Sequence, residues 1–500
     1  MTLRNWEDVR GDTVLDADVV IIGTGPGGAA AGRVLAEAGA RVVMLEEGPA
    51  RPMFRPNLAH TQRYHMQESG TMVARGRQFV PVAAGRGVGG GSLVNSAICF
   101  RTPPSVLEGW KPVLGGDDRF APARLAPVFD EIEALIGVGV TRDEVAGENN
   151  RILVRGAAAL GLPGGLIRRN APGCVGCGIC NYGCPSGGKA SVDRNLIPMA
   201  IAAGAIVQGD VKVDQIHHAG GAVAAVSGLV SHTETGELRG RLTVRAPRVV
   251  LAAGGIGTPR LLHHAGLSAR LGPAVGRGLH LHPGSALLGE CDHPVTMWRG
   301  ATQGAWFEHP DLPGVLPHTF NAPPDTLVLL LGNVGLAAKA DLQRLPNLCG
   351  CVVMISDHGE GRVGSTSDGR ADISYAFDPH DVDRIKAGMV ETARVLLAGG
   401  ARRVTAPVHE IGWHDSPESL GKGLANKAIT DFALYASHPM ATCRMGADPA
   451  TSVIGPTGEA HGLRGLFLAD SSIFPTSLGV NPQLTTMVLA TAIARELASH

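Results

Sequence analysis

Residues 18–28 have the sequence DVVIIGTGPGG, in which a continuous apolar run ends in a glycine-rich turn. A run of this length and composition predicts a buried parallel strand over residues 18–23. The Ala-rich segment 27–40 predicts a short helix with small residues toward the sheet. Residues 41–46, RVVMLE, predict a second buried strand. The first fifty residues are therefore predicted to contain one βαβ unit.

Three glycines of the turn, Gly23, Gly25 and Gly28, match the pattern G-x-G-x-x-G. Between a strand and a helix, such glycines permit a tight turn and let a pyrophosphate approach the positive helix N-terminus. Glu46 ends the second strand, where a carboxylate can hydrogen-bond a ribose diol and would repel a 2′-phosphate. The unit predicts a dinucleotide site and leaves NAD and FAD as alternatives.

Two further segments separate these alternatives. Residues 85–95, GRGVGGGSLVN, form a second glycine-rich stretch, and residues 466–494 contain a strand, a turn and a helix. A nicotinamide enzyme of ordinary design needs neither segment. Residues 248–253 form another buried run, as expected for a strand that returns to the nucleotide-binding sheet. These features favour FAD.

The composition is that of a globular enzyme rather than a nucleic-acid-binding or membrane protein. The chain has 500 residues, with 44 Lys and Arg, 45 Asp and Glu and a formal charge of −1. No basic run is long enough to follow a phosphate backbone, and no apolar stretch reaches the roughly 18 residues of a transmembrane segment. The length favours roughly two or three domains. We expect a soluble cytoplasmic protein that binds no nucleic acid.

The middle of the chain predicts a separate, substrate-facing domain. Between about residues 285 and 435 the pattern shifts to β-like segments, such as 326–331 and 351–355. One amphipathic helix is predicted at 381–398. Other predicted helices span residues 127–138, 196–204 and 482–498.

In the order and spacing of its motifs, the chain resembles the glucose-methanol-choline (GMC) family of FAD-dependent oxidoreductases. The landmarks are the βαβ unit and residues 85–95, 249–259, 275–283, 438–446 and 468–482. The resemblance implies an α/β fold, with a Rossmann-like FAD-binding domain and a second α+β substrate domain built on an antiparallel sheet. The domains expected on this basis are residues 14–105, 195–285 and 436–500 for FAD binding, 106–194 as a connecting region, and 286–435 for substrate binding.

The resemblance also implies which residues surround FAD, in addition to the opening glycines and Glu46. The implied contacts are Gly89, Gly90, Ser92 and Asn95 near the isoalloxazine ring, Val213 against the adenine, Asp470 at the ribityl-diphosphate region and Pro482 at the last helix. That helix is expected to point its positive N-terminal end at the flavin. Hydride arrival at N5 places negative charge on N1 and C2=O, which a helix N-terminus stabilises.

His438 occupies the position of the family's catalytic histidine, and Asn481 occupies that of its partner. A neutral imidazole can accept the hydroxyl proton of an alcohol as hydride leaves carbon for the flavin, while Asn481 orients the oxygen. Asn481 before Pro482 also predicts a helix start, with Asn as N-cap and Pro at the first helical position. Ala441 stands where the family usually has glycine, which is expected to alter the local turn.

Four cysteines form a second chemical signal. Cys174, Cys177, Cys180 and Cys184 match C-x2-C-x2-C-x3-C-P, the spacing of bacterial ferredoxins. No second set with this spacing exists in the chain, so the segment predicts at most one centre. Three interpretations stay open: an iron-sulfur cluster that carries electrons out, a structural zinc on four thiolates, or a reduced loop without metal.

The predicted activity is oxidation of a small-molecule alcohol to an aldehyde or ketone. The electrons are expected to pass through an iron-sulfur cluster to an external acceptor, such as an acceptor protein. The alternatives are an alcohol oxidase that uses O2, with zinc or no metal, and a flavin and iron-sulfur electron carrier. His438 and Asn481 favour the enzyme, because a carrier needs no base at the flavin. Sugars, aminoglycoside-like polyols, long-chain alcohols and sterols all stay open as substrates.

Overall fold

A six-stranded parallel sheet contains the opening βαβ unit in the computed structural model, which describes residues 3–331 and 335–499. Its strands, in spatial order, are β1 (Leu3–Arg4), β10 (Ile206–Gln208), β4 (Val42–Leu45), β3 (Val19–Ile22), β14 (Arg248–Leu251) and β23 (Leu466–Leu468). Every neighbouring pair is parallel. The four strands predicted from apolar runs are therefore neighbours, although two of them lie more than two hundred residues from the first two.

Helices cover this sheet as the Ala-rich pattern predicted. Helix α1 (Pro26–Glu37) packs against α14 (Gln483–Ala498) and α7 (Leu196–Ala202). The predicted helix 27–40 ends earlier than expected, because Gly39 has φ of 88°, a left-handed conformation that ends a helix. A Cβ at Gly28 would lie 2.0 Å from the Gly23 carbonyl oxygen, so glycine is required where the helix meets the turn.

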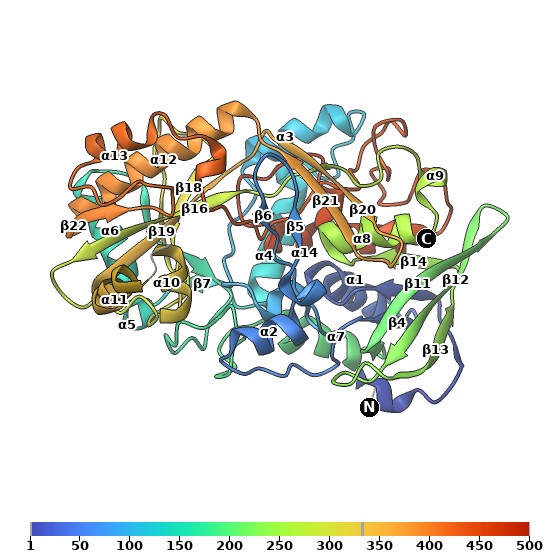
Figure 1. Cartoon of the computed structure of the whole chain (residues 1–500). Helices are drawn as coiled ribbons and strands as arrows, with labels where there is room; N and C mark the ends of the chain where they lie inside the picture. Colours follow the sequence, from blue (N-terminus) through green and yellow to red (C-terminus); the bar gives the residue numbers. More distant parts are fainter. Residues whose placement is uncertain (1–2, 332–334, 500) are drawn as a thin grey trace.

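Beside the parallel sheet lies a four-stranded sheet that forms the outer edge of this part of the molecule (Figure 1). Its strands, in spatial order, are β11 (Val211–Ala219), β12 (Ala222–Ser231), β13 (Leu238–Arg245) and β2 (Thr13–Asp16). The first three pair antiparallel and β2 joins β13 in parallel.

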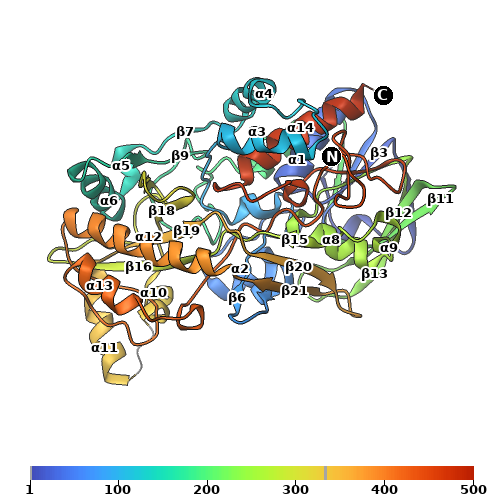
Figure 2. The same ribbon diagram turned by 90° about the horizontal axis from the view of Figure 1, so that it is seen from above.

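A second six-stranded sheet, antiparallel, lies at the opposite end of the molecule (Figures 1 and 2). Its strands, in spatial order, are β22 (Ala401–Thr405), β16 (Gly284–Cys291), β19 (Leu348–Ile355), β18 (Val315–Thr319), β17 (Ala305–Phe307) and β8 (Gly164–Leu166). Helix α12 (Pro379–Ala398) packs against this sheet and against α6 (Glu148–Ala159) and α13 (Pro417–Leu424). The predicted α/β fold with a second, antiparallel domain is confirmed.

Part of the region that was expected to be a connection contributes to the antiparallel sheet. Strand β8 and helix α6 come from the region 106–194, which we assigned to a connection, yet β8 pairs with β17 of the antiparallel sheet. Their apolar residues, such as Ile152 and Leu153, belong to the hydrophobic core of that sheet. Part of the expected connecting region therefore packs with the antiparallel sheet.

A small sheet joins the two ends of the molecule. It contains β15 (Arg277–Leu279), β20 (Glu360–Ser365) and β21 (Ala371–Ala376). Strands β20 and β21 pack against α8 (Gly254–His264), which follows β14 of the parallel sheet. The chain between β19 and β20 therefore runs from the antiparallel sheet to the half of the molecule that contains the parallel sheet.

One secondary-structure prediction was wrong. Residues 326–331, predicted as β-like, lie in helix α10 (Pro324–Leu331). A short run of apolar residues fits a buried strand and a buried helix equally well, and proline at the first helical position favours the helix. The strand at 351–355 and the helix at 381–398 are confirmed; α12 begins at Pro379 because the Asp378 side chain accepts a hydrogen bond from the His380 N–H.

The remaining longer elements are α2 (Leu58–His65), α3 (Pro104–Val113), α4 (Pro122–Leu135) and α11 (Gly335–Arg344). Helix α4 contains most of the predicted helix 127–138. Over residues 3–331 and 335–499, no helix combines the length and apolar character needed to cross a bilayer.

Candidate active site

A cavity opens along the carboxyl ends of the parallel strands, the edge where open α/β sheets bind their ligands. Gly23 after β3, Glu46 after β4, Ala252 after β14 and Asp470 after β23 all line it. The other predicted residues on its wall are Gly25, Gly90, Asn95, Val213, His438, Asn481 and Pro482. Residues that are scattered over the sequence thus share one enclosed space.

The two glycine-rich segments touch each other in the wall of this cavity. A Cβ at Gly90 would lie 2.6 Å from Gly25 Cα, and Gly90 has φ of 53°. Gly25 is the N-cap of α1, and Pro26 and Gly27 of its first turn also line the cavity. Backbone that lacks side chains beside a helix N-terminus is suited to a pyrophosphate.

Glu46 is buried and accepts four hydrogen bonds. Its Oε1 accepts from the backbone N–H groups of Gly48 (3.1 Å) and Gly87 (3.0 Å). Its Oε2 accepts from the Thr24 N–H (3.1 Å) and hydroxyl (2.8 Å). Burial, followed by the nearby Glu47 charge, raises the pKa of Glu46, and these donors oppose that rise. Because a carboxylate has about four acceptor sites, a ribose hydroxyl would share or displace one of these donors.

Three predicted cofactor residues do not line the cavity: Gly28, Gly89 and Ser92. The Ser92 hydroxyl donates to the Gly89 carbonyl (2.7 Å) and accepts from the Val192 N–H (3.1 Å). These contacts fix the shape of the second glycine-rich segment. Ser92 therefore supports the cavity wall from behind.

Asp470 ends the parallel sheet with its carboxylate directed at neighbouring backbone. It accepts hydrogen bonds from the N–H groups of Gly254 (2.8 Å) and Ser472 (2.8 Å) and from the Thr258 hydroxyl (2.5 Å). Burial raises its pKa and these hydrogen bonds lower it. Asp470 therefore joins the start of α8 to the turn after β23.

His438 and Asn481 meet on the cavity wall. The Asn481 amide nitrogen lies 3.1 Å from His438 Nε2. Burial lowers the pKa of His438 well below its ordinary value, and the neighbouring His282 and His318 rings lower it further. The imidazole is therefore neutral at pH 7 and able to accept a proton. His282, which the sequence analysis missed, lies behind it with the two Nδ1 atoms 3.4 Å apart.

Backbone pairing places these two histidines together. The N–H of His280 donates to the Met440 carbonyl (3.1 Å), and the Met440 N–H donates to the His280 carbonyl (3.0 Å). His282 follows His280 by two residues, and His438 precedes Met440 by two. Because the two segments run antiparallel, His282 and His438 lie on the same side of this pair. Ala441 has φ of 66°, so the position where the family usually has glycine does adopt a left-handed conformation here.

Asn481 does not cap the last helix as predicted. Helix α14 begins at Gln483, Pro482 occupies the N-cap position, and no side chain caps the helix. The Asn481 amide nitrogen contacts His438 instead, and its buried carbonyl oxygen has no hydrogen-bond partner in the described part of the chain. This unpaired oxygen leaves Asn481 able to bind a ligand in the cavity.

The four cysteines are not arranged as predicted for a metal centre. Within residues 3–331 and 335–499, no group of three or more His, Cys, Asp or Glu side chains could hold a metal ion. The Cys180 sulfur instead accepts a hydrogen bond from Arg169 (3.3 Å), and the Cys184 sulfur accepts one from the Lys189 N–H (3.2 Å). The thiols in this arrangement do not fit an iron-sulfur cluster or zinc.

The cysteine segment nevertheless borders the cavity. Asn181, between the second pair of cysteines, lines it. The buried Lys189 ammonium donates to the carbonyls of Leu93 (2.9 Å) and Asn95 (2.9 Å), which belong to the second glycine-rich segment. Gln303, Tyr435 and Ser437 also line the cavity, and no sequence motif marks them.

Comparison with known proteins agrees with this arrangement. The family model for GMC oxidoreductases matches residues 63–284 in its N-terminal part and 357–490 in its C-terminal part. A model for pyridine nucleotide-disulphide oxidoreductases matches residues 17–93, which include the βαβ unit.

An uncharacterized GMC-type oxidoreductase of Mycobacterium tuberculosis is 35% identical over 96% of this chain and 76% of its own length. A long-chain-alcohol oxidase of Arabidopsis thaliana is 29% identical over 98% of this chain and 69% of its own length. The crystal structure of pyridoxine 4-oxidase, named as from Mesorbium loti, superposes with a TM-score of 0.71 and 20% identity, covering 97% and 99% of the two chains. The protein belongs to the GMC oxidoreductases, a family of FAD-binding flavoproteins.

Proposed function

We propose that this protein oxidises an alcohol to an aldehyde or ketone, with His438 as the base that accepts the hydroxyl proton. The observation that supports this most directly is the contact between His438 and Asn481 on the wall of the cofactor cavity. A pure electron carrier has no use for a neutral imidazole paired with an amide at this place.

The chemistry requires a proton acceptor that is uncharged before reaction. An alcohol hydroxyl does not ionise at neutral pH, so a base within hydrogen-bond reach must take its proton as the carbinol hydrogen leaves. Burial lowers the pKa of His438 and thereby supplies the neutral imidazole. Bound FAD supplies the acceptor for the hydride at N5.

Asn481 positions the alcohol oxygen in this proposal. Its carbonyl oxygen is buried, faces no partner among the described residues, and stands one residue before the cavity-lining Pro482. An amide next to the imidazole can hold a hydroxyl so that the proton points at His438 Nε2. The N-terminus of α14 follows directly, and its partial positive charge favours negative charge in the adjacent part of the cavity.

The electron acceptor forms the second part of the proposal. The Arabidopsis relative is an oxidase by name, which favours O2 as the acceptor here. A dehydrogenase that passes electrons directly from the flavin to an acceptor protein is the alternative. Hydrogen peroxide formation during turnover in air identifies the oxidase, and turnover only with an artificial acceptor identifies the dehydrogenase.

The test is reduction of the bound flavin without oxygen. The FAD-loaded protein is mixed with 1-dodecanol, cholesterol, paromomycin or glucose, which represent the alcohol classes left open by the sequence. Loss of absorbance near 450 nm reports hydride transfer. At least one alcohol is expected to reduce the flavin, and His438→Gln is expected to slow that reduction about 1000-fold with FAD still bound.

His358→Gln provides a matched control. His358 is exposed and its Nδ1 lies 2.9 Å from Asp381 Oδ1, away from the cavity. This variant should reduce its flavin at the wild-type rate. If His438→Gln reduced its flavin as fast as His358→Gln, His438 would not be the base.

A further inference from the structure

Behind the proposed base, a line of buried polar groups leads away from the cavity. His282 is 2% exposed, and its Nδ1 lies 3.4 Å from His438 Nδ1. The two rings meet edge to face, with an interplanar angle of 84°. Because each neutral imidazole carries one proton, one of the two facing nitrogens can donate to the other.

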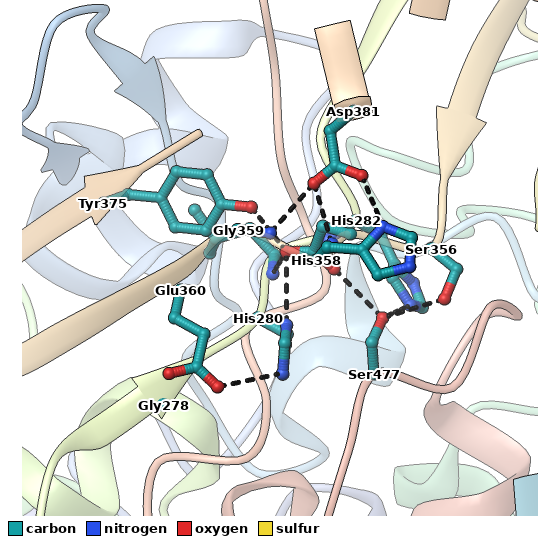
Figure 3. A network of polar contacts seen from close by, with 12 residues as sticks. Gly278, His280, His282, Ser356, His358, Gly359, Glu360, Tyr375, Asp381 and Ser477 are labelled. Carbon is teal, nitrogen blue, oxygen red and sulfur yellow. Dashed lines mark hydrogen bonds and ion pairs between the residues drawn. The ribbon is translucent and has the colours of Figure 1, made fainter. Parts of the chain in front are cut away.

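The line continues through a serine to a carboxylate. His282 Nε2 lies 2.9 Å from the Ser477 hydroxyl, which in turn donates to Asp357 Oδ1 at 3.0 Å. Figure 3 shows His282, Ser477 and Ser356 gathered at this point of the network. His282 follows β15, Asp357 lies between β19 and β20, and Ser477 precedes α14. Three distant segments of the chain thus contribute to one row of contacts.

Asp357 keeps its negative charge in this position. It is 3% exposed and accepts hydrogen bonds from the Leu281 N–H (2.8 Å) and the Tyr375 hydroxyl (2.7 Å). His280 Nδ1 lies 3.7 Å from it. Burial raises the pKa of Asp357, but His280, His282 and the Leu281 N–H lower it below its ordinary range. A fixed anion therefore stands two hydrogen bonds behind His282.

His282 is held in a backbone conformation that residues other than glycine seldom adopt. Its φ is 48°, in the left-handed region. Such a residue costs of the order of 1–3 kcal/mol and persists only where its surroundings require it. The surroundings here are the contacts of its ring with His438, Ser477 and the Gly479 N–H, together with its own N–H to Asp357 (3.4 Å).

The neutral rings of His438 and His282 together carry two protons. These protons can occupy three places, which are His438 Nε2, the pair of facing Nδ1 atoms and His282 Nε2. One of the three places is therefore always empty. When the empty position is His282 Nε2, that nitrogen accepts the Gly479 N–H, which lies 3.0 Å away. When His282 Nε2 carries a proton, it donates to Ser477 and gives up the Gly479 N–H, and the empty position moves to His438 Nε2. Only this second arrangement gives His438 Nε2 a lone pair, which accepts from the Asn481 amide nitrogen at 3.1 Å until a substrate hydroxyl takes that place.

We propose that Asp357 and Ser477, acting through His282, hold the empty ring position on His438 Nε2 and thereby make His438 a base. The proposal rests on the proposed function and names three positioning residues for it. The Ser477 hydroxyl donates to the Asp357 carboxylate, and its oxygen accepts from the Ser356 hydroxyl and has a second lone pair that can accept from His282 Nε2. The Asp357 anion favours a proton on His282 Nε2.

In the proposed reaction, the alcohol O–H bond breaks and an N–H bond forms at His438 Nε2. Bound FAD would supply the acceptor for the hydride that the carbinol carbon loses. The His438 Nδ1–H bond can then break in favour of His282 Nδ1, which moves the positive charge from His438 to His282. Asp357 remains ionised and stabilises that charge through Ser477, as the buried carboxylate does in a serine-protease triad.

The kinetic test compares two serines in the FAD-loaded protein. Ser477→Ala is expected to slow anaerobic flavin reduction by about 10-fold, with the most effective alcohol of 1-dodecanol, cholesterol, paromomycin and glucose as the probe. Ser356→Ala is the matched control, because the Ser356 hydroxyl contacts the Ser477 hydroxyl (3.3 Å) and lies outside the row. Its rate should stay within twofold of the wild type.

A double variant tests whether the groups act as one unit. Asp357→Asn is expected to slow reduction at least as much as Ser477→Ala, and combining the two should add little further loss. If Asp357→Asn does not fold, the serine pair still decides. Additive losses, or equal rates for the two serine variants, would overturn the proposal.

A readout that needs no substrate separates this proposal from the proposed function. In protein labelled with ¹⁵N-histidine, the His438 signals, assigned by their loss in His438→Gln, should show a proton on Nδ1 and none on Nε2. Ser477→Ala should shift the proton toward Nε2, and Ser356→Ala should not. A His438 tautomer that does not respond to Ser477 would refute the relay even if the alcohol oxidation is real. If no alcohol reduces the wild-type flavin, the proposed function fails. The NMR measurement of the His438 tautomer still tests whether Ser477 and Asp357 act on His438 through His282.

Discussion

Two ends of the cavity are built in different ways: the cofactor end, where FAD is proposed to bind, and the base end, which contains the proposed base His438. At the cofactor end, Gly23, Gly25 and Glu46 come from one segment of about thirty residues, and backbone groups and glycines form the wall. At the base end, His438, Asn481 and His282 come from three distant segments and act through side chains. A site formed by backbone groups therefore depends on one local segment of sequence, whereas a site formed by side chains depends on how distant segments pack.

The largest expected difference between the two ends concerns pH and stability. At the base end, burial lowers the pKa of both His282 and His318 from about 6.5 to about 4. Below pH 6.5 the unfolded chain therefore binds protons that the folded chain does not, and stability is lost as pH falls toward 4. The loss at pH 5 is about 2 kcal/mol for each ring. At the cofactor end, burial raises the pKa of Glu46 and Asp470, which acts in the opposite direction.

Urea unfolding of wild type and His318→Gln at pH 7 and pH 5 measures the histidine contribution. The fall in unfolding free energy between the two pH values should be about 2 kcal/mol smaller in His318→Gln. Glu46 and Asp470 are present in both proteins, so their effect cancels. Equal pH dependence in the two proteins would show that His318 does not titrate in this range.

The second prediction concerns Gly90→Ala, a variant that should weaken FAD binding at the cofactor end and leave the base end unchanged. Gly90→Ala places a Cβ 2.6 Å from Gly25 Cα at a residue with φ of 53°. We expect FAD affinity to fall about 100-fold, because the two glycine-rich segments must separate. The rate of flavin reduction in the FAD-loaded fraction should stay close to the wild type. Titration of the apoprotein with FAD, followed by flavin fluorescence, gives the affinity.

Gly109→Ala serves as the control for Gly90→Ala, since a Cβ at Gly109 meets nothing within 4 Å. It should bind FAD like the wild type. Equal affinities for the two variants would mean that the contact between the glycine-rich segments does not shape the cofactor site.

The third prediction concerns Asn481→Ala, a variant that should slow flavin reduction at the base end and leave FAD binding unchanged. Asn481→Ala removes the amide beside His438 Nε2 and the unpaired carbonyl oxygen. We expect flavin reduction by an alcohol to slow about 10-fold while FAD stays bound. Asn481→His keeps a polar group at this place and should recover part of the rate. Loss of FAD from Asn481→Ala, without a change in the rate of the bound fraction, would assign Asn481 to the cofactor instead.

The smallest expected effect is on the unfolding free energy and concerns the turn after His438. Ala441 has φ of 66°, which costs an alanine about 1 kcal/mol more than a glycine. Ala441→Gly should therefore raise the unfolding free energy by up to about 1 kcal/mol, measured by urea unfolding, because the strain relieved exceeds the entropy that glycine adds to the unfolded chain. A lower free energy in Ala441→Gly would mean that the surrounding contacts relieve the strain in the wild type.

Much of the fold followed from local patterns. The buried runs at 18–23, 41–46, 248–253 and 466–470 predicted four strands, and all four are neighbours in the parallel sheet. The run at 326–331 was misread because its five consecutive apolar residues, 327–331, show no period that distinguishes strand from helix. Strand β8 could not be assigned to the antiparallel sheet, since Gly164–Leu166 acquires its partner β17 only when the chain folds.

The cysteine segment shows the limit of spacing as evidence. Its pattern matches ferredoxins in sequence, yet the described residues place no three such ligands around one point. Spacing fixes only how far apart ligands lie along the chain. Their convergence depends on the loop conformation, here set by hydrogen bonds from Arg169 and Lys189 to the sulfurs.

By itself, the sequence determined the dinucleotide-binding unit and the individual strands of the parallel sheet, because each is a contiguous run of residues. The family resemblance marked His438 and Asn481 as candidates. Only the tertiary structure decided that His282, Ser477 and Asp357 stand behind His438. No motif links these three residues, which are up to two hundred positions apart. Their contacts exist because the pairing of His280 with Met440 and the passage from β19 to β20 bring separate segments together.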